Sequence, residues 1–224
     1  MPVPAVVGAA GRASSNADCG APTWQGRTAK VDQSVARALR RYPGVPAVYG
    51  WLRLDRRGRW WLDGEAVTHS RLRDFIARNY ARDGWGGWYF QNGPQRAYVA
   101  LDETPFTLHL PAGRQRLVTH IGEEIERIDG AWLDEHDTLL LLGRCQAGAR
   151  VGCLEDQSLG RFSEGIEAHH GGLCLRYAGR LLPVGRMTRA QAPWRLGFVR
   201  EPRPISDRSQ AGGVETAHTP DDDP

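Results

Sequence analysis

Hydrophobic and polar residues alternate along much of the chain, and this two-residue period predicts β-strands. Leu52 and Leu54 alternate with Arg53, turn-forming residues follow at 55–58, and the alternation resumes at Trp60. Such a period sends neighbouring side chains to opposite faces of a sheet, and a polar turn between two such segments is typical of a hairpin. We therefore predict a β-hairpin here.

The same period continues through the second half of the chain. It predicts strands at 106–110, 139–142 and 150–154, a hairpin around Ala178 and Gly179, and a final edge strand at 193–199. Ile125 and Ile128 do not keep strict alternation, which indicates a bulge. Residues 156–165 fit either a poor helix or a loop.

Apolar residues return every three or four positions in two segments, which is the spacing of an amphipathic helix. The first segment is 31–41, where Pro43 ends the pattern, and the second is 69–79. Thr68 stands where the second helix should begin, because its hydroxyl can accept a backbone N–H of the first turn. We predict a short helix in each segment.

An Asn-Gly-Pro break at residues 92–94 separates two strand-like runs. An Asn-Gly type I′ turn would require a backbone donor at Pro94, and proline has none. We therefore predict a four-residue loop over 91–94, with Phe90 opposite Gln95. The strands are then expected to bury one face, which carries Trp88, Phe90, Ala97, Val99 and Leu101, and to direct the other face outward.

Together these segments predict an α+β protein that is mostly β, with two small antiparallel-sheet subdomains and one or two short helices. The predicted parts are a disordered tail at 1–28, an N-terminal α+β subdomain at 29–113, a C-terminal mostly β subdomain at 114–200 and a disordered, acidic-ended tail at 201–224. Both tails are rich in small and polar residues without hydrophobic periodicity.

The charge distribution is uneven although the net charge is only +3. Residues 27–96 carry 14 basic and 6 acidic side chains (+8), whereas residues 97–170 carry 6 basic and 13 acidic (−7). The two halves are expected to attract each other or to be simply solvated, and so small a net charge does not by itself indicate nucleic-acid binding.

No apolar run reaches the roughly 18 residues that span a bilayer, so no membrane segment is expected. The N-terminal segment has an apolar patch but lacks the basic start and the leucine-rich centre of a secretory leader. The four cysteines are sparse for a disulfide framework in a chain of this length. We therefore expect a cytoplasmic protein.

Several motifs resemble one family. The order of GRWWLDGEAV, YFQNGPQRAYV, DGAWLDEHDTLLL and RLGFVREP, within residues 45–203, is similar to that of an uncharacterised bacterial domain-of-unknown-function family. The resemblance implies a two-part, strand-rich cytoplasmic protein, and it implies no activity and no catalytic residues.

Cysteine and histidine residues raise the question of a metal or catalytic site. Cys145, Cys153, His169, His170 and Cys174 lie within about 30 residues of one another. Zinc prefers thiolate and imidazole ligands, but no C-x-x-C pair occurs, so neither a metal nor another cofactor is predicted. The alternative function is a small enzyme that uses Cys153 or Cys174 with His169 or His170 as its base, which requires Cys and His to converge in a pocket.

Other hydrolytic chemistries lack support in the sequence. No G-x-S-x-G elbow and no G-x-x-x-x-G-K-[ST] loop occur, and the GWGG run at 84–87 lacks the lysine that phosphate binding needs. The acidic pairs fall at predicted turns and strand ends, where solvated carboxylates keep ordinary acidity.

A binding surface is the remaining candidate site. Tyr89, Arg96 and Tyr98 share one strand face, and Arg56 and Arg57 belong to the same basic segment. Aromatic stacking together with Arg is how strand-rich modules hold single-stranded nucleic acid, although a peptide would fit equally well. The simplest interpretation is that this face packs against the acidic half of the chain. The functional interpretation is a non-enzymatic binding or adaptor module for an unknown protein partner or anionic ligand, with nucleic acid less favoured.

Overall fold

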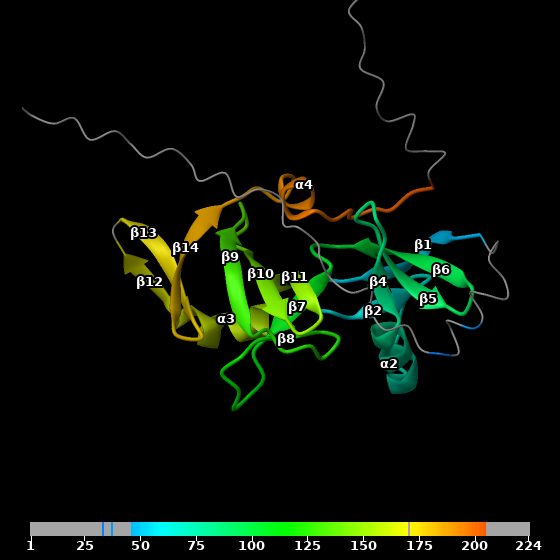
Figure 1. The fold of residues 1–224 in the computed structure, drawn as a ribbon, viewed down its shortest axis with the longest axis horizontal. Helices are drawn as coiled ribbons and strands as arrows, with labels where there is room; N and C mark the ends of the chain where they lie inside the picture. The colour runs from blue at the N-terminus through cyan, green and yellow to red at the C-terminus, as the bar shows by residue number, and fades with distance from the viewer. Residues whose placement is uncertain (1–32, 34–36, 38–45, 170, 205–224) are drawn as a thin grey trace, which may run out of the picture.

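The computed structural model describes residues 33, 37, 46–169 and 171–204, and this part of the chain forms two β-sheets with short helices beside them (Figure 1). The mostly β fold class is therefore confirmed. Of the helix predicted at 31–41, only Gln33 and Arg37 are described, and both are helical. The predicted tail at 1–28 and most of the one at 201–224 lie outside the described residues.

The first sheet has six strands in the order β3-β2-β1-β6-β5-β4. Its strands are β1 (Val48–Leu54), β2 (Trp60–Leu62), β3 (Glu65–Ala66), β4 (Tyr80–Arg82), β5 (Trp88–Asn92) and β6 (Gln95–Leu101). Neighbouring strands are antiparallel except β1 and β6, which are parallel. The prediction of antiparallel sheets is thus only partly right, because five other elements lie between β1 and β6, and β6 runs in the same direction as β1.

The second sheet has eight strands in the order β12-β13-β14-β9-β10-β11-β7-β8. Its strands are β7 (Phe106–His109), β8 (Val118–Thr119), β9 (Arg127–Leu133), β10 (Leu139–Cys145), β11 (Gly148–Leu154), β12 (Ile166–His169), β13 (Gly172–Tyr177) and β14 (Arg180–Arg186). It too is mixed, since β7 runs parallel to β11 and β14 runs parallel to β9. The predicted hairpin around Ala178 and Gly179 is confirmed as the β13–β14 turn.

Three helices have described bounds, namely α2 (Ser70–Arg78), α3 (Asp156–Ser163) and α4 (Ala192–Leu196). The helix predicted at 69–79 is confirmed as α2, although its N-cap is His69 and makes no side-chain capping bond. Thr68 therefore does not cap it. None of the described helices is both long and apolar enough to cross a bilayer.

The edge strand predicted at 193–199 is wrong, because this segment contains α4. Pro193 lies in the first turn, where its missing N–H costs nothing, and Gly197 ends the helix with a φ of 71°. A short apolar run has no period long enough to distinguish a helix from a strand. Residues 156–165, which fitted a helix or a loop, include α3.

The β5–β6 hairpin turns at Gly93 and Pro94, and not over the four residues 91–94 as predicted. Asn92 pairs with Gln95, so the two residues between them form the whole loop. Gly93 has a φ of 58°, which suits the first central position of a tight hairpin turn. The donor that closes such a turn belongs to Gln95, so proline is never required to donate.

The true register differs from the predicted one by two residues, and a shift of two keeps every side chain on its predicted face. Phe90 stands opposite Ala97 instead of Gln95. Trp88, Phe90 and Val99 are buried together in the core, as the alternation predicted.

The bulge expected near Ile128 is confirmed in β9. The pairing of β9 with β10 shifts between Leu142 and Gly143, which leaves Asp129 as the extra residue. Arg127 and Arg144 both form ion pairs with its carboxylate, at 3.0 and 2.7 Å.

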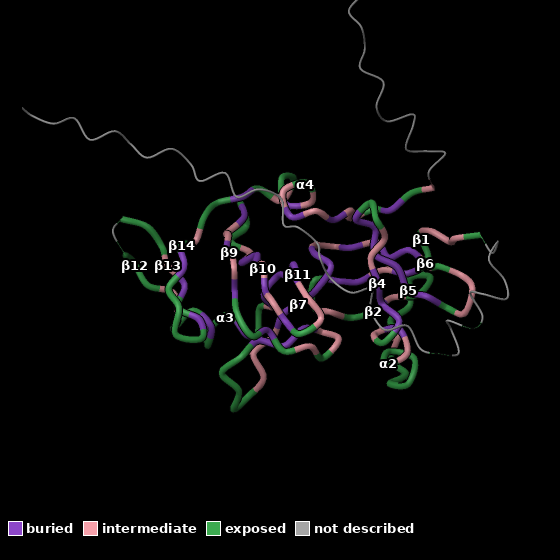
Figure 2. Tube along the Cα trace, viewed as in Figure 1, coloured by how far each residue is buried: buried purple, intermediate pink, exposed green. Residues whose placement is uncertain are grey.

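Two large hydrophobic clusters hold the fold together, and a third, small one surrounds Tyr89 and Tyr98. The first joins the two sheets, because it contains residues of both, such as Leu54 and Leu140. The second lies on the other face of the eight-stranded sheet and includes Leu141 and Phe162 of α3. Residues 139–142 thus face the two clusters in turn, which explains why all four of these residues are leucine. Figure 2 shows the contrast between these buried residues and the exposed β12.

The predicted division into domains near residue 113 stays a prediction. β7, on the N-terminal side of that division, is a strand of the eight-stranded sheet. Met187, Leu196 and Phe198, near the C-terminal end of the described chain, pack in the same cluster as the six-stranded sheet.

Candidate binding surface

The face of the six-stranded sheet that points away from the core carries three of the five residues predicted to bind a ligand. Cross-strand pairing puts Arg53 opposite Trp61 and Tyr89 opposite Tyr98, and these residues alternate with the ones that face the first core cluster. We call this surface the aromatic–arginine face; it consists of Tyr49, Trp51, Arg53, Arg59, Trp61, Tyr89, Arg96 and Tyr98.

Tyr89 and Tyr98 form the buried floor of the aromatic–arginine face, with exposed fractions of 5% and 7%. Tyr49 stacks on Tyr98 with the ring centroids 4.6 Å apart and the planes 5° from parallel. The Tyr98 hydroxyl donates to Asp83 at 2.9 Å. Burial, reinforced by this bond, raises the pKa of Tyr98 to about 12. The two predicted rings therefore support the surface and offer little of their own area to a ligand.

Arg96 lies on top of that floor and is exposed. Its guanidinium carbon is 4.7 Å from the centroid of the Tyr89 ring, and its Nε donates to Gln91 Oε1 at 3.4 Å. No carboxylate of the described residues forms an ion pair with it. Burial raises the pKa of Tyr89, so the ring under Arg96 stays neutral at ordinary pH. The Tyr89 ring and Gln91 thus orient the guanidinium, while the Arg96 side chain remains exposed.

A second arginine–aromatic stack occupies the β1–β2 end of the same face. Arg53 and Arg59 place their guanidinium carbons 4.8 and 5.4 Å from the Trp61 ring centroid. Arg53 also pairs with Asp102 at 2.7 Å. Trp51 is 62% exposed beside them and is the accessible aromatic ring of this face.

The turn that presents Arg59 is rigid because of Asp55. Its buried carboxylate accepts the backbone N–H groups of Arg57 and Arg59, the Arg59 Nε–H and the Trp61 Nε1–H, at 2.7 to 3.0 Å. Burial would raise the pKa of Asp55, but the hydrogen bonds from Trp61, Arg59 and Arg57 outweigh it and lower the pKa. An ionised carboxylate therefore fixes both members of the stack.

The other two predicted residues, Arg56 and Arg57, lie in this turn and are exposed. Arg56 reaches across to α3 and pairs with Asp156 at 2.8 Å, so Arg56, like Arg53 with Asp102, joins the basic segment 27–96 to the acidic segment 97–170. Arg57 has no side-chain partner among the described residues. Sequence alone grouped these arginines by charge, whereas their actual partners depend on the packing of the two sheets.

Among the described residues, Cys153 lies far from His169, its predicted base. Cys153 lies on β11 and His169 on β12, five strand positions apart in the sheet, or roughly 24 Å at the usual strand spacing. Burial raises the pKa of Cys153 to about 11. Cys174 lies on β13 beside β12, while His170 is outside the described residues. No group of three or more His, Cys, Asp or Glu able to hold a metal occurs within the described ranges.

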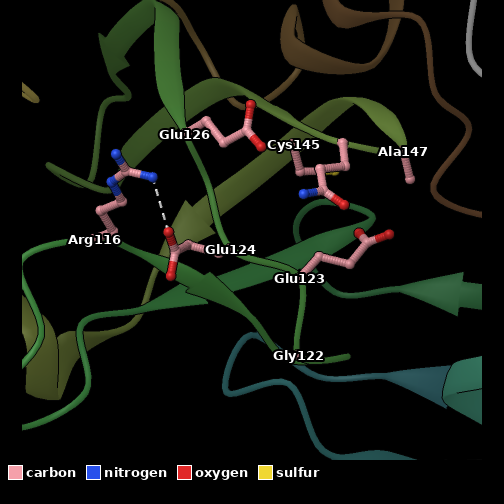
Figure 3. A pocket seen from close by; sticks show the side chains of 8 residues that line it. Arg116, Gly122, Glu123, Glu124, Glu126, Cys145 and Ala147 are labelled. Atoms are coloured by element: carbon pink, nitrogen blue, oxygen red, sulfur yellow. Dashed lines mark hydrogen bonds and ion pairs between the residues drawn. The ribbon is translucent and has the colours of Figure 1, made fainter.

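An open hollow of about 550 Å³ lies beside the β10–β11 turn and is edged by acidic residues (Figure 3). Two of its carboxylates are already engaged: Glu123 is bound by Arg150, and Glu124 by Arg116 at 2.9 Å. Burial raises the pKa of Cys145, which also lines it. The hollow is therefore lined by carboxylates that already form ion pairs and by a thiol that stays protonated. A catalytic cysteine needs a thiolate, so this lining does not support catalysis.

Two strongly exposed tryptophans were missed by sequence periodicity, because neither lies on a long periodic element. Trp85 in the β4–β5 turn is 74% exposed, and Trp194 on α4 is 70% exposed. Their segments are joined, since Val199 N–H donates to Gly86 O at 3.0 Å, and Figure 1 shows the β4–β5 turn beside the chain that leaves α4. The glycines around Trp85 are the only sequence signal for this arrangement.

Two solved structures are similar to this chain. A DUF1285 family protein from Silicibacter pomeroyi DSS-3 is 16% identical, with a TM-score of 0.47, over 62% of this chain and 81% of that one. A DUF1285 family protein from Shewanella baltica OS155 is 15% identical, with a TM-score of 0.38, over 51% of this chain and 91% of that one. No curated protein sequence matches the chain.

The model of one protein family, DUF2944, described as "Protein of unknown function (DUF2946)", matches residues 31–203. The resemblance to a domain-of-unknown-function family is thereby confirmed. Since the match spans well over half of the sequence, the chain belongs to this family of proteins of unknown function.

Proposed function

We propose that the protein is a non-enzymatic binding module whose aromatic–arginine face holds an acidic segment of a protein partner. The observation that carries this proposal is the position of Arg96. It is exposed, stacked 4.7 Å from the Tyr89 ring centroid, and unpaired with any described carboxylate. A guanidinium in this state can take a ligand carboxylate through two parallel N–H bonds.

The stacking matters because it lowers the entropy lost on binding. A free arginine side chain loses much rotamer freedom when it binds, whereas Arg96 and the two arginines at Trp61 are already oriented. Arg53 and Arg59 each use only part of their donor set on an internal carboxylate. Trp51 adds an exposed apolar surface to this end of the face. Together these features favour a ligand with both carboxylates and apolar groups.

Single-stranded nucleic acid would need bare aromatic rings on which bases can stack. Tyr89 and Tyr98 are covered, by Arg96 and by Tyr49 respectively. Only Trp51 remains strongly exposed on this face. An acidic peptide requires no such platform, which is why we prefer it.

The test compares retention on immobilised poly-L-glutamate for the wild type, Arg96→Glu and Arg73→Glu. Arg73 lies on α2, is exposed, and gives the same change in net charge, so it is the matched control. We expect Arg96→Glu to elute at clearly lower salt than Arg73→Glu, with both variants folded by circular dichroism. Equal elution of the two variants would show that only net charge matters. Loss of polyuridylate binding without loss of polyglutamate binding would favour nucleic acid instead.

A further inference from the structure

β12 is an edge strand whose free side is open. Among the described residues, β13 is its one strand partner, and it lies on one side only. Glu167, Ala168 and His169 are exposed, and in Figure 1 the β12–β13–β14 strands form one end of the molecule. Such an edge presents backbone donors and acceptors that can template another strand.

The other described sheet edges are less suited to pairing. β3 and β8 are two residues long, and β8 is buried. β4 has three residues, of which Tyr80 and Ala81 are buried. β12 is therefore the longest and most accessible edge in the described part of the chain.

The direction of the backbone groups of β12 follows from the β12–β13 ladder. Arg176 N–H donates to Gly165 O at 2.7 Å, so these two residues form a hydrogen-bonded pair. Bonded and non-bonded pairs alternate along an antiparallel ladder. Glu167 and His169 therefore turn their backbone groups toward β13, whereas Ala168 turns its N–H and C=O toward the free edge.

We propose that a second copy of this chain pairs with β12 through its own β12, antiparallel, with Ala168 opposite Ala168 of the second copy. A two-fold axis passes through this pair, and each alanine donates its N–H to the other's carbonyl. The eight-stranded sheets of the two copies become continuous. This inference concerns the opposite sheet and does not rest on the proposed function.

Side-chain charge selects this register. With the alanines opposite each other, Glu167 of each copy faces His169 of the other, which gives two complementary cross-strand pairs. A shift of one residue in each copy would put the two Glu167 carboxylates opposite each other, which is unfavourable. Glu167 is held by a bidentate bond from Arg176, at 2.9 and 3.0 Å. That bond also lowers the pKa of Glu167, so the carboxylate stays charged.

The first test is sedimentation velocity of the full chain over a range of concentrations up to about 500 µM, because a contact made by one short edge is small and expected to be weak. We expect a concentration-dependent dimer for the wild type. Ala168→Pro removes only an outward N–H and leaves the β12–β13 bonds intact, so it should remain monomeric throughout. A wild type that stays monomeric, or an Ala168→Pro variant that still dimerises, would overturn the proposal.

Two substitutions of His169 with opposite charges provide a second test, which still applies if Ala168→Pro unfolds β12. His169→Lys puts a positive side chain opposite Glu167 and should retain the dimer. His169→Glu puts two carboxylates opposite each other and should weaken dimerisation at least tenfold. Identical dissociation constants for these two variants would contradict the register.

Discussion

Acid is expected to destabilise this protein through His120. Its ring packs among Trp60, Tyr80 and Phe106, with centroids 5.3 to 6.0 Å away. The Nδ1 atom accepts the Thr107 N–H at 3.3 Å, so the neutral ring carries its proton on Nε2. Nε2 is sealed from solvent and has no acceptor among the described residues. A second proton would have to displace the Thr107 bond and put a full charge among aromatic rings.

The size of the effect follows from the pKa. Burial, with a smaller contribution from His109, lowers the pKa of His120 from 6.5 to about 3, against the opposing charge of Asp55. Between these two values the unfolded chain binds more protons than the folded chain, so the free energy of unfolding falls as the pH falls. At about 1.4 kcal/mol per pH unit, the loss is about 2 kcal/mol at pH 5 and saturates below pH 3.

The assay is urea unfolding at pH 7 and at pH 5 for the wild type and His120→Asn. The asparagine Oδ1 can replace Nδ1 as the acceptor for Thr107, and the side chain does not titrate. Each protein is compared with itself at the two pH values, so the packing lost in the variant cancels. We expect the wild type to lose about 2 kcal/mol more than the variant. An equal loss in both proteins would refute the idea that His120 is kept neutral by burial.

Two further predictions concern a turn and a thiol. Gly58→Ala should destabilise the fold by about 3 kcal/mol in urea unfolding, because φ is +75° and an added Cβ would lie 2.6 Å from His120 Cβ. Gly64→Ala has the same backbone strain with open space around it, so about 1 kcal/mol is expected, and equal losses would contradict the steric argument. Cys153, with a pKa of about 11, should stay unmodified by iodoacetamide at pH 8 while the partly exposed Cys174 reacts; mass spectrometry that finds Cys153 alkylated first would disprove its protection.

The sequence by itself determined the features that depend on neighbouring residues. The two-residue period assigned Trp88, Phe90 and Val99 to one buried face, and the structure agrees. The helical spacing at 69–79 located α2 to within a residue at each end. The family membership also follows from local motifs, and it agrees with the mostly β fold. The structure confirms these predictions because each depends on a short periodic segment whose apolar side must be buried.

The candidate site was only partly determined in this way. Alternation correctly put Tyr89 and Tyr98 on the face opposite the core, but it could not reveal that Tyr49 would stack on one of them and Arg96 on the other. Trp51, the ring that stays exposed, follows a glycine at which the strand departs from its regular register. Accessibility of a residue depends on what other strands place above it, and no local pattern carries that information.

Only the tertiary structure decided which strands pair, where the β5–β6 turn closes and whether a short apolar segment forms a helix or a strand. β1 and β6 pair in parallel although five elements separate them, and Arg56 forms an ion pair with Asp156, one hundred residues away in the chain. The turn closes at Gly93 and Pro94 because of the pairing that follows it. Periodicity fixes which side of an element is apolar, whereas the burial of the two clusters fixes which elements meet, and that choice depends on the whole chain at once.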